Sequence, residues 1–232
     1  MSLHKEISFE NEICGHLGAA GWIYEEGAAA GYDRARALFP EDLRDWLMAT
    51  QPKVLETLEK AHGGAALDVL CERLRKQLND RGALDVLRHG LELIGVRGLV
   101  SLAQFAPASG MNPEIVARYQ ANRVRVIRQL RYSRANENSI DLGLFLNGIP
   151  IATAELKTDF TQTIGDAIDQ YKFDRHPKGE PLLTFPSGAL VHFAVSNRDV
   201  MMTTKLEGGA TRFLPFNRGN RGGAGNPADG TG

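Results

Sequence analysis

The segment Asn138–Lys157, with the sequence NSIDLGLFLNGIPIATAELK, limits the possible folds of this chain more than any other segment. It consists of two apolar runs on either side of an Asn-Gly dipeptide at positions 147–148, which favours the two-residue turn of a β-hairpin. Asp141 lies on the first run, and Glu155 and Lys157 end the second. Unpaired charges on a buried hairpin are costly, so each of these groups needs a partner, a metal ion or a substrate.

The spacing of the two acidic residues constrains the register of this hairpin. A two-residue turn sets Asp141 opposite Ala154. Asp141 and Glu155 then point to opposite faces of the sheet, because side chains alternate along a strand, whereas Glu155 and Lys157 share a face. One extra residue in the hairpin would bring Asp141 opposite Glu155.

We therefore predict an irregularity in the hairpin. It is either a bulge or bend between Asn147 and Pro150 or a kink at Gly143. A break beside Pro150 is expected because proline has no N–H to donate to a neighbouring strand.

With that register, Asp141 and Glu155 can supply oxygen ligands to Mg²⁺. Lys157 can hold an attacking water or neutralise charge that develops on a phosphate. An Asp followed by Glu-x-Lys on the next strand is the arrangement of a magnesium-dependent phosphodiesterase. The alternative is that these residues are ordinary surface charge. Because they are embedded in consecutive apolar strands, we interpret the domain as a nuclease.

The remaining pattern indicates an α/β fold. Apolar spacing predicts helices over 5–18 and 41–60, with an interruption at Pro52, and two further helices marked by Leu67–Leu78 and Leu84–Ile94. Strands are predicted over 123–132, 189–195 and 200–206, with a helix over 161–175 that begins in a capping box of Thr163 and Asp166. We expect a mixed sheet flanked by helices, with a helical insertion at about 33–110.

Two packing expectations follow from this pattern. Along the strand 123–132, Val124, Val126, Leu130 and Tyr132 should share one face, as should Ile140, Leu142, Leu144 and Leu146 on the next strand. The small Ala152 and Ala154 leave room for a helix, for which 161–175 is the candidate. His192, in the alternating run LVHFAV, is expected to be a core histidine with a satisfied hydrogen bond.

The charge balance restricts how the chain can bind nucleic acid. Lys and Arg number 27 against 28 Asp and Glu, so positive charge must be concentrated locally. The candidates for phosphate contacts are Arg123, Arg125, Arg131, Lys172 and Arg175. The equally weighted alternative is that the arginines pair with carboxylates of the helical half.

The cysteine pattern and the hydropathy indicate the cellular compartment that we expect for the protein. Cys14 and Cys71 are isolated thiols without metal-ligand spacing, which predicts a reduced compartment and no structural zinc. The sequence contains no signal-peptide pattern and no apolar run of membrane-spanning length. We expect a cytoplasmic protein without a membrane partner.

Several segments resemble the N-terminal nuclease domain of type I restriction endonuclease R subunits. They are FENEICGHLGAAGW, NSIDLGLFLNGIPIATAELK, DAIDQYKFDRHP, GALVHFAVSNRDVMMTTKL and FLPFNRGNRGGAGNP. The resemblance implies a restriction-endonuclease-like PD-(D/E)xK fold over residues 1–216. It also implies that the Gly-rich 217–232 is a linker toward ATP-driven motor domains. The chain has no G-x-x-x-x-G-K-[ST] loop, so ATP would bind only in motor domains absent from it.

The resemblance also assigns roles to residues. Asp141 is the first carboxylate of the motif, and Glu155 and Lys157 form its E-x-K pair, while Ile140 stands where the motif name has proline. Glu10 matches a family glutamate that can face the metal, the alternative being a solvated helix face. The family's Q-x-x-x-Y motif, which helps to place DNA, is matched only in part. Tyr171 fits its tyrosine, but Ala167 stands at the glutamine position and the nearby glutamine is Gln170.

Three functions are consistent with this resemblance. The leading hypothesis is a Mg²⁺-dependent endonuclease that cuts duplex DNA after translocation by the motor domains, with modification and specificity subunits as partners. The second is a stand-alone nuclease of the same fold. The third is a noncatalytic domain that docks the motor to the modification and specificity subunits.

Overall fold

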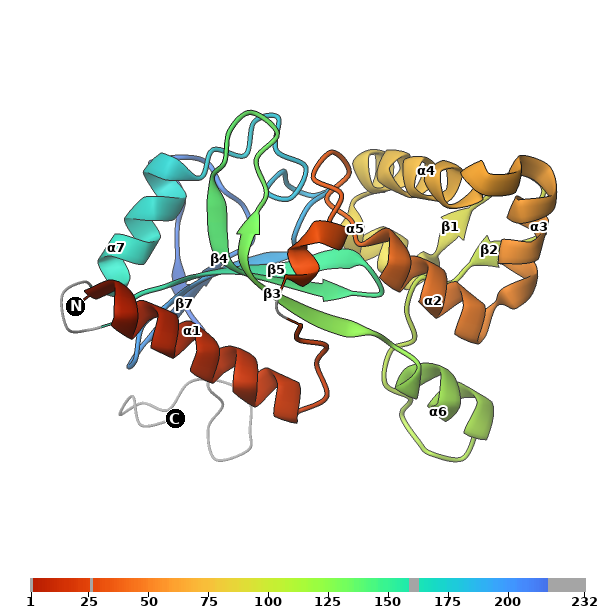
Figure 1. Ribbon diagram of the computed structural model, residues 1–232, viewed down its shortest axis with the longest axis horizontal. Helices are drawn as coiled ribbons and strands as arrows, with labels where there is room; N and C mark the ends of the chain where they lie inside the picture. The colour runs from red at the N-terminus through yellow and green to blue at the C-terminus, as the bar shows by residue number, and fades with distance from the viewer. Residues whose placement is uncertain (1, 26, 159–162, 217–232) are drawn as a thin grey trace.

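The computed structural model describes residues 2–25, 27–158 and 163–216 (Figure 1). Within these residues, six strands form a mixed sheet in the order β3-β4-β5-β6-β7-β8. The strands are β3 (Val124–Arg131), β4 (Ser139–Leu146), β5 (Ile149–Leu156), β6 (Val191–Val195), β7 (Val200–Thr203) and β8 (Leu214–Pro215). Only the pair β5 and β6 is parallel. The prediction of an α/β fold with a mixed sheet flanked by helices is confirmed. The segment predicted to be a linker, 217–232, lies outside the described residues.

A helical region accounts for most of the first half of the chain and lies beside the sheet (Figure 1). Its main elements are α2 (Pro40–Thr50), α3 (Pro52–His62), α4 (Ala66–Arg81) and α5 (Ala83–His89), with 3₁₀ turns at Ala28–Gly31 and Gly63–Ala65. A short hairpin of β1 (Leu91–Glu92) and β2 (Leu99–Val100) and the projecting α6 (Pro113–Gln120) follow. Trp46 and the buried leucines of α2 to α5 form a core that reaches the sheet at Ile149. The break predicted at Pro52 is confirmed.

The helix predicted around Leu84–Ile94 is wrong in its second half. α5 ends one residue before Gly90, whose φ is 82° and where a Cβ atom would lie 2.5 Å from the carbonyl oxygen of Val100. A helix cannot continue through such a backbone, so Leu91 enters β1 and pairs with Val100. Ile94, expected in the core, is 78% exposed.

Helices lie on both faces of the sheet, but not in the predicted arrangement. α1 (Ser2–Ala19) crosses the face of Ala154 and Leu156, where Cys14 packs against both residues (Figure 1). α7 (Ile164–Asp169) and the π-helical turn Gln170–Asp174 that continues it belong to the crossover from β5 to β6. The expectation that 161–175 covers Ala154 is therefore wrong, because the buried Tyr171 of this turn packs on the opposite face. The capping box of Thr163 and Asp166 is present as predicted.

The tip of the hairpin between β4 and β5 is anchored in the helical region. Asn147 and Gly148 have φ values of 49° and 81°, as a tight hairpin turn with two left-handed residues requires. The buried Asn147 side chain accepts a hydrogen bond from the N–H of Arg123 at 2.7 Å and donates one to the carbonyl of Leu102 at 2.9 Å. The N–H of Phe39 donates to the carbonyl of Gly148 at 2.9 Å. These bonds hold the turn between β3 and the helical region.

Gly148→Ala should therefore destabilise the domain strongly. A Cβ at this position would lie 2.3 Å from the carbonyl oxygen of Phe39, and the positive φ adds strain. Gly95→Ala is the matched control, because Gly95 has a φ of 83° with nothing within 4 Å of the added Cβ. We expect Gly95→Ala to lower the free energy of unfolding by about 1 kcal/mol and Gly148→Ala by about 2–4 kcal/mol, measured by urea denaturation. Equal losses in the two variants would contradict the close contact at the turn.

Candidate active site

The hairpin contains the extra residue that the sequence predicts. Phe145 of β4 pairs with Pro150 of β5, whereas Leu144 pairs with Ala152, so Ile151 is a bulge residue. The predicted irregularity is confirmed, and it lies directly after Pro150, next to the interval in which it was expected. Because a bulge adds one residue to one strand only, every pair beyond it is shifted by one position.

The shifted register brings the two acidic residues together. Leu142 pairs with Ala154, and the next step sets Asp141 opposite Glu155. At this step the Asp141 carboxylate accepts a hydrogen bond from the N–H of Leu156 at 2.7 Å. A side chain thus replaces a backbone acceptor at the end of the paired region.

Asp141 also lies where the first two strands of the sheet bend. Val126 packs beneath α1, whereas Leu130 packs in the cluster on the opposite face, although alternation predicts one face for both. On β4, Ile140 lies in the cluster of Leu130, whereas Leu142 lies in the cluster of Val126. The predicted alternation fails because Gln129, between Val126 and Leu130, has a φ of 50°. At such a residue the backbone leaves the extended conformation that alternation requires.

Gln129 connects Asp141 to the first helix. Its amide Nε2 donates to Oδ1 of Asp141 at 3.1 Å and to Oε1 of Glu10 at 2.8 Å. Glu10 is buried, and its Oε2 lies 3.3 Å from Nε of Arg128. Glu10 therefore faces the site rather than solvent. However, no cluster of three or more His, Cys, Asp or Glu side chains suited to a metal ion occurs within the described parts of the chain.

The surroundings of Glu155 strongly shift the pKa of its carboxyl group. It is fully buried, and Nε of Arg175 donates to its Oε1 at 2.5 Å. The other oxygen, Oε2, is buried and has no hydrogen-bond partner among the residues described. Burial and the negative charge of Asp141 raise the pKa of Glu155, Arg175 opposes both effects, and the resulting pKa is about 8. A second cation beside Oε2 would stabilise the ionised carboxylate.

Lys157 follows the end of β5 on the same side as Glu155. Its backbone N–H donates to the carbonyl of Val195 at 2.9 Å, which extends the pairing of β5 with β6 past Leu156. The residue is only 7% exposed. Its position, two residues after Glu155, is that of the lysine in the predicted E-x-K pair.

These groups fit a magnesium ion. Asp141 and Glu155 offer hard carboxylate oxygens from two adjacent strands, and Oε2 of Glu155 has no partner of its own within the described residues. Magnesium is commonly bound through one or two carboxylates while it keeps several water molecules. Asp141 and Glu155 are therefore the candidate ligands, and Glu10 is a more distant candidate.

A buried polar network, which the sequence analysis did not predict, is centred on Thr153, two residues before Glu155 on β5. The hydroxyl of Thr153 lies 2.8 Å from the hydroxyl of Tyr171 and 2.7 Å from Nδ1 of His192. The expectation of a satisfied core histidine is confirmed, and burial lowers the pKa of His192 to about 4. Tyr171 is fully buried, so its predicted contact with DNA does not agree with its position in the structure. A polar Thr153 two residues before Glu155, on the same strand face, was the available signal.

Two of the arginines predicted to contact phosphate, Arg123 and Arg125, follow the alternative interpretation and pair with a carboxylate of the helical region. The buried Arg125 donates to both carboxylate oxygens of Asp42, at 2.5 and 2.9 Å, and Arg123 donates to one of them at 3.1 Å. Burial opposes ionisation of Asp42, but the hydrogen bonds and charges of both arginines outweigh it and lower its pKa. Arg125 therefore ties the sheet to α2 and is not exposed for phosphate contact. Arg131 remains at the surface, paired with Glu137 at 2.8 Å.

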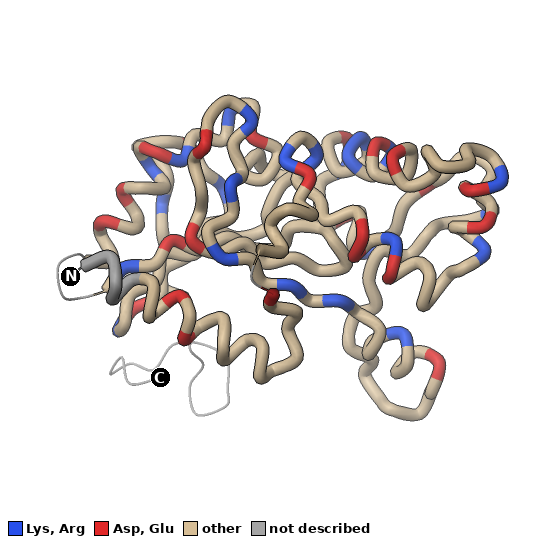
Figure 2. Tube along the Cα trace, viewed as in Figure 1, with Lys and Arg blue, Asp and Glu red and all other residues tan. Residues whose placement is uncertain are grey.

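The other predicted DNA contacts lie on the π-helical turn. Lys172 is half-buried, Arg175 is bound to Glu155, and the buried Oε1 of Gln170 has no partner among the described residues. Their contact with DNA stays a prediction. Figure 2 shows basic and acidic residues interspersed over the helical region and the sheet. Directly at the acidic pair, Arg175 supplies positive charge.

A mixed sheet flanked by helices, with an acidic pair and a lysine at one end of a bulged hairpin, defines a restriction-endonuclease-like domain. The chain belongs to the family described as the type I restriction enzyme R protein N terminus, whose model matches residues 6–211. The resemblance noted in the sequence is thereby confirmed. Membership of this family implies association with DNA and with other subunits of a type I system. A comparison with curated proteins gives no significant match.

Among the described residues, no helix combines the length and the apolar character needed to span a bilayer.

Glu155→Gln should stabilise the domain, and the gain should grow with pH. The folded protein holds the Glu155 proton up to about pH 8, whereas an ordinary glutamic acid loses it near 4.5. Between these values the wild-type protein loses stability as pH rises, by at most about 1.4 kcal/mol per pH unit, and a glutamine does not ionise. Urea unfolding in the presence of a chelator, between pH 5 and pH 8, measures the difference. The exposed Glu56→Gln on α3 controls for the loss of one charge. A difference that does not change with pH would contradict a buried, destabilised carboxylate.

Proposed function

We propose that this domain is the Mg²⁺-dependent endonuclease module of a type I restriction enzyme R subunit, which hydrolyses phosphodiester bonds of duplex DNA. The observation that carries the proposal is the bulge at Ile151, which sets Asp141 opposite Glu155 at the end of the paired strands. A regular two-residue hairpin would place these carboxylates on opposite faces. Family membership supports the proposal independently.

The residues of the chain have separate tasks in this proposal. The N–H of Leu156 and the amide of Gln129 orient the Asp141 carboxylate. Arg175 holds one oxygen of Glu155, and the other oxygen has no hydrogen-bond partner among the described residues. The Lys157 ammonium group positions the attacking water or neutralises charge that develops on the phosphate. Bound Mg²⁺ would polarise the phosphoryl group and lower the pKa of a coordinated water.

The wider setting is proposed from the family. Cleavage would follow ATP-driven translocation by motor domains of the same subunit, and modification and specificity subunits would be the partners. A noncatalytic docking domain is less well supported, since such a role does not require a fully buried glutamate beside a second carboxylate.

Calorimetric titration with Mg²⁺ and Mn²⁺ tests the metal site. The unmutated domain should bind one ion, and Asp141→Ala and Glu155→Ala should both abolish binding because the ion shares the two carboxylates. Asp80→Asn, which removes an exposed carboxylate on α4, is the control and should bind normally. Absence of binding by the unmutated domain, or binding that survives both alanine variants, would contradict the proposed site.

Lys157→Ala separates catalysis from metal binding. We expect this variant to bind the ion normally and, in the complete R subunit assembled with its partners, to cut DNA at least about 100-fold more slowly, since one stabilising group is lost. Cleavage is measured by linearisation of circular plasmid DNA. Unchanged cleavage by Lys157→Ala or Asp141→Ala assemblies would favour the docking function.

A further inference from the structure

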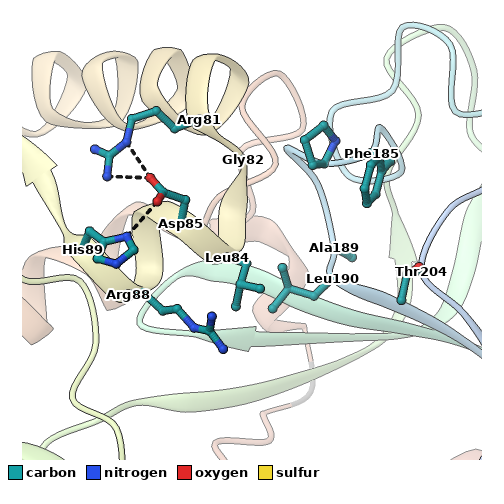
Figure 3. Close-up of a pocket in the computed structure, with 11 residues that line it drawn as sticks. Arg81, Gly82, Leu84, Asp85, Arg88, His89, Phe185, Ala189, Leu190 and Thr204 are labelled. Atoms are coloured by element: carbon teal, nitrogen blue, oxygen red, sulfur yellow. Dashed lines mark hydrogen bonds and ion pairs between the residues drawn. The ribbon is translucent and has the colours of Figure 1, made fainter.

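A cavity of about 480 Å³ lies between α5 and the loop that precedes β6 (Figure 3). Its apolar lining comes from Leu84, Phe185, Pro186, Ala189 and Leu190. Leu84 and Phe185 are 45% and 52% exposed, which is unusual for large apolar side chains that face each other across an open space. The volume is within the range of pockets that bind small molecules.

This cavity, called the groove below, has two walls, α5 and the loop before β6, which contact each other directly. The N–H of Ala83 donates to the carbonyl of Pro186 at 2.9 Å, which joins the start of α5 to the loop. Gly82 has a φ of 87°, and a Cβ atom there would lie 3.3 Å from the Pro186 ring. The positive φ and the close Pro186 ring both favour glycine at position 82, where the helical region joins the loop.

The charges along the groove leave one cation uncommitted. Nε of Arg81 and Nδ1 of His89 both lie 2.7 Å from oxygens of Asp85, so this carboxylate is paired (Figure 3). Arg88 also lines the cavity, and it has no hydrogen bond or ion pair within the described part of the chain. The groove therefore combines an apolar lining with one free guanidinium group.

We propose that this groove binds a small organic anion, in which an aromatic or aliphatic body carries one carboxylate, sulfonate or phosphate group. The apolar body lies between Leu84 and Phe185, and the anionic group is held by Arg88. A DNA duplex fits less well, because phosphate backbones are followed by rows of basic side chains rather than by one arginine beside an apolar cavity. The anion can be a free small molecule or an acidic residue next to an aromatic residue in a peptide segment.

The groove and the acidic pair can be tested independently. Leu190 of the groove precedes β6, whereas Glu155 pairs with Ala194 farther along that strand. Asp141→Asn should therefore leave binding in the groove unchanged, whatever its effect at the acidic pair.

Two fluorescent probes test the proposal on the domain itself. 8-Anilinonaphthalene-1-sulfonate has an aromatic body and one anionic group, and N-phenyl-1-naphthylamine has the same rings without the sulfonate. We expect saturable binding of one sulfonate probe per domain. Arg88→Gln should raise its dissociation constant about fivefold or more and change that of the neutral probe less than twofold, because a charge-assisted hydrogen bond is lost. Phe185→Ser should weaken both probes.

The control is Arg134→Gln, which removes another exposed arginine whose side chain has no partner among the described residues. It should bind both probes as the unmutated domain does. Displacement of the sulfonate probe by 3-phenylpropionate or by a capped Phe-Asp dipeptide distinguishes a free small molecule from a peptide segment as the source of the anion. Sulfonate binding that is unsaturable, or equally strong in Arg88→Gln, would overturn the proposal.

Discussion

The register of one hairpin determines whether this domain has a site at all. Without the bulge at Ile151, Asp141 would lie opposite Ala154 and its carboxylate would point away from Glu155. The bulge depends on the chain around it, because Pro150 has no N–H to donate and the turn beyond it is fixed by the bonds of Asn147. A loose turn could shift the register and lose the bulge. The buried contacts of the helical region with the turn are therefore a condition for the acidic pair on the opposite end of the strands.

The site is assembled at a cost to folding. A fully buried glutamate beside a second carboxylate is unfavourable, and its raised pKa measures that cost. Arg175 offsets part of it with a single charged hydrogen bond to Oε1. The remaining oxygen is left without a partner among the described residues, and hydrophobic packing of α1 and the sheet must supply the balance. Such an arrangement is expected where a cation is bound rather than where two elements are only held together.

Local patterns were sufficient to predict much of this structure. The Asn-Gly turn and the two apolar runs predicted the hairpin, because these features act within a few residues. Its extra residue was predicted from the need to place Asp141 and Glu155 on one face, with Pro150 indicating where a break was expected. The sequence could not show which helix covers Ala154, since α1 and α7 are both amphipathic and only tertiary packing decides between them. Nor could it show the left-handed backbone of Gln129, which reverses the alternation of β3 and whose side-chain amide bridges Asp141 and Glu10. The pairing of Arg125 with Asp42 joins residues far apart in the chain and was only one of two equal alternatives.

The helical region has a second consequence for the sheet. Asp42 of α2 binds Arg123 and Arg125 at one end of β3, while Gln129 farther along the same strand contacts the acidic pair. β3 is thus held at one end by buried ion pairs and bent at the other. The far end of the strand is held as well, because Leu130 and Arg131 pair with β4 and Gln129 bonds to Glu10 and Asp141. The groove beside α5 lies at the start of β6, whereas Glu155 pairs farther along that strand with Ala194, so the two sites occupy different parts of the sheet.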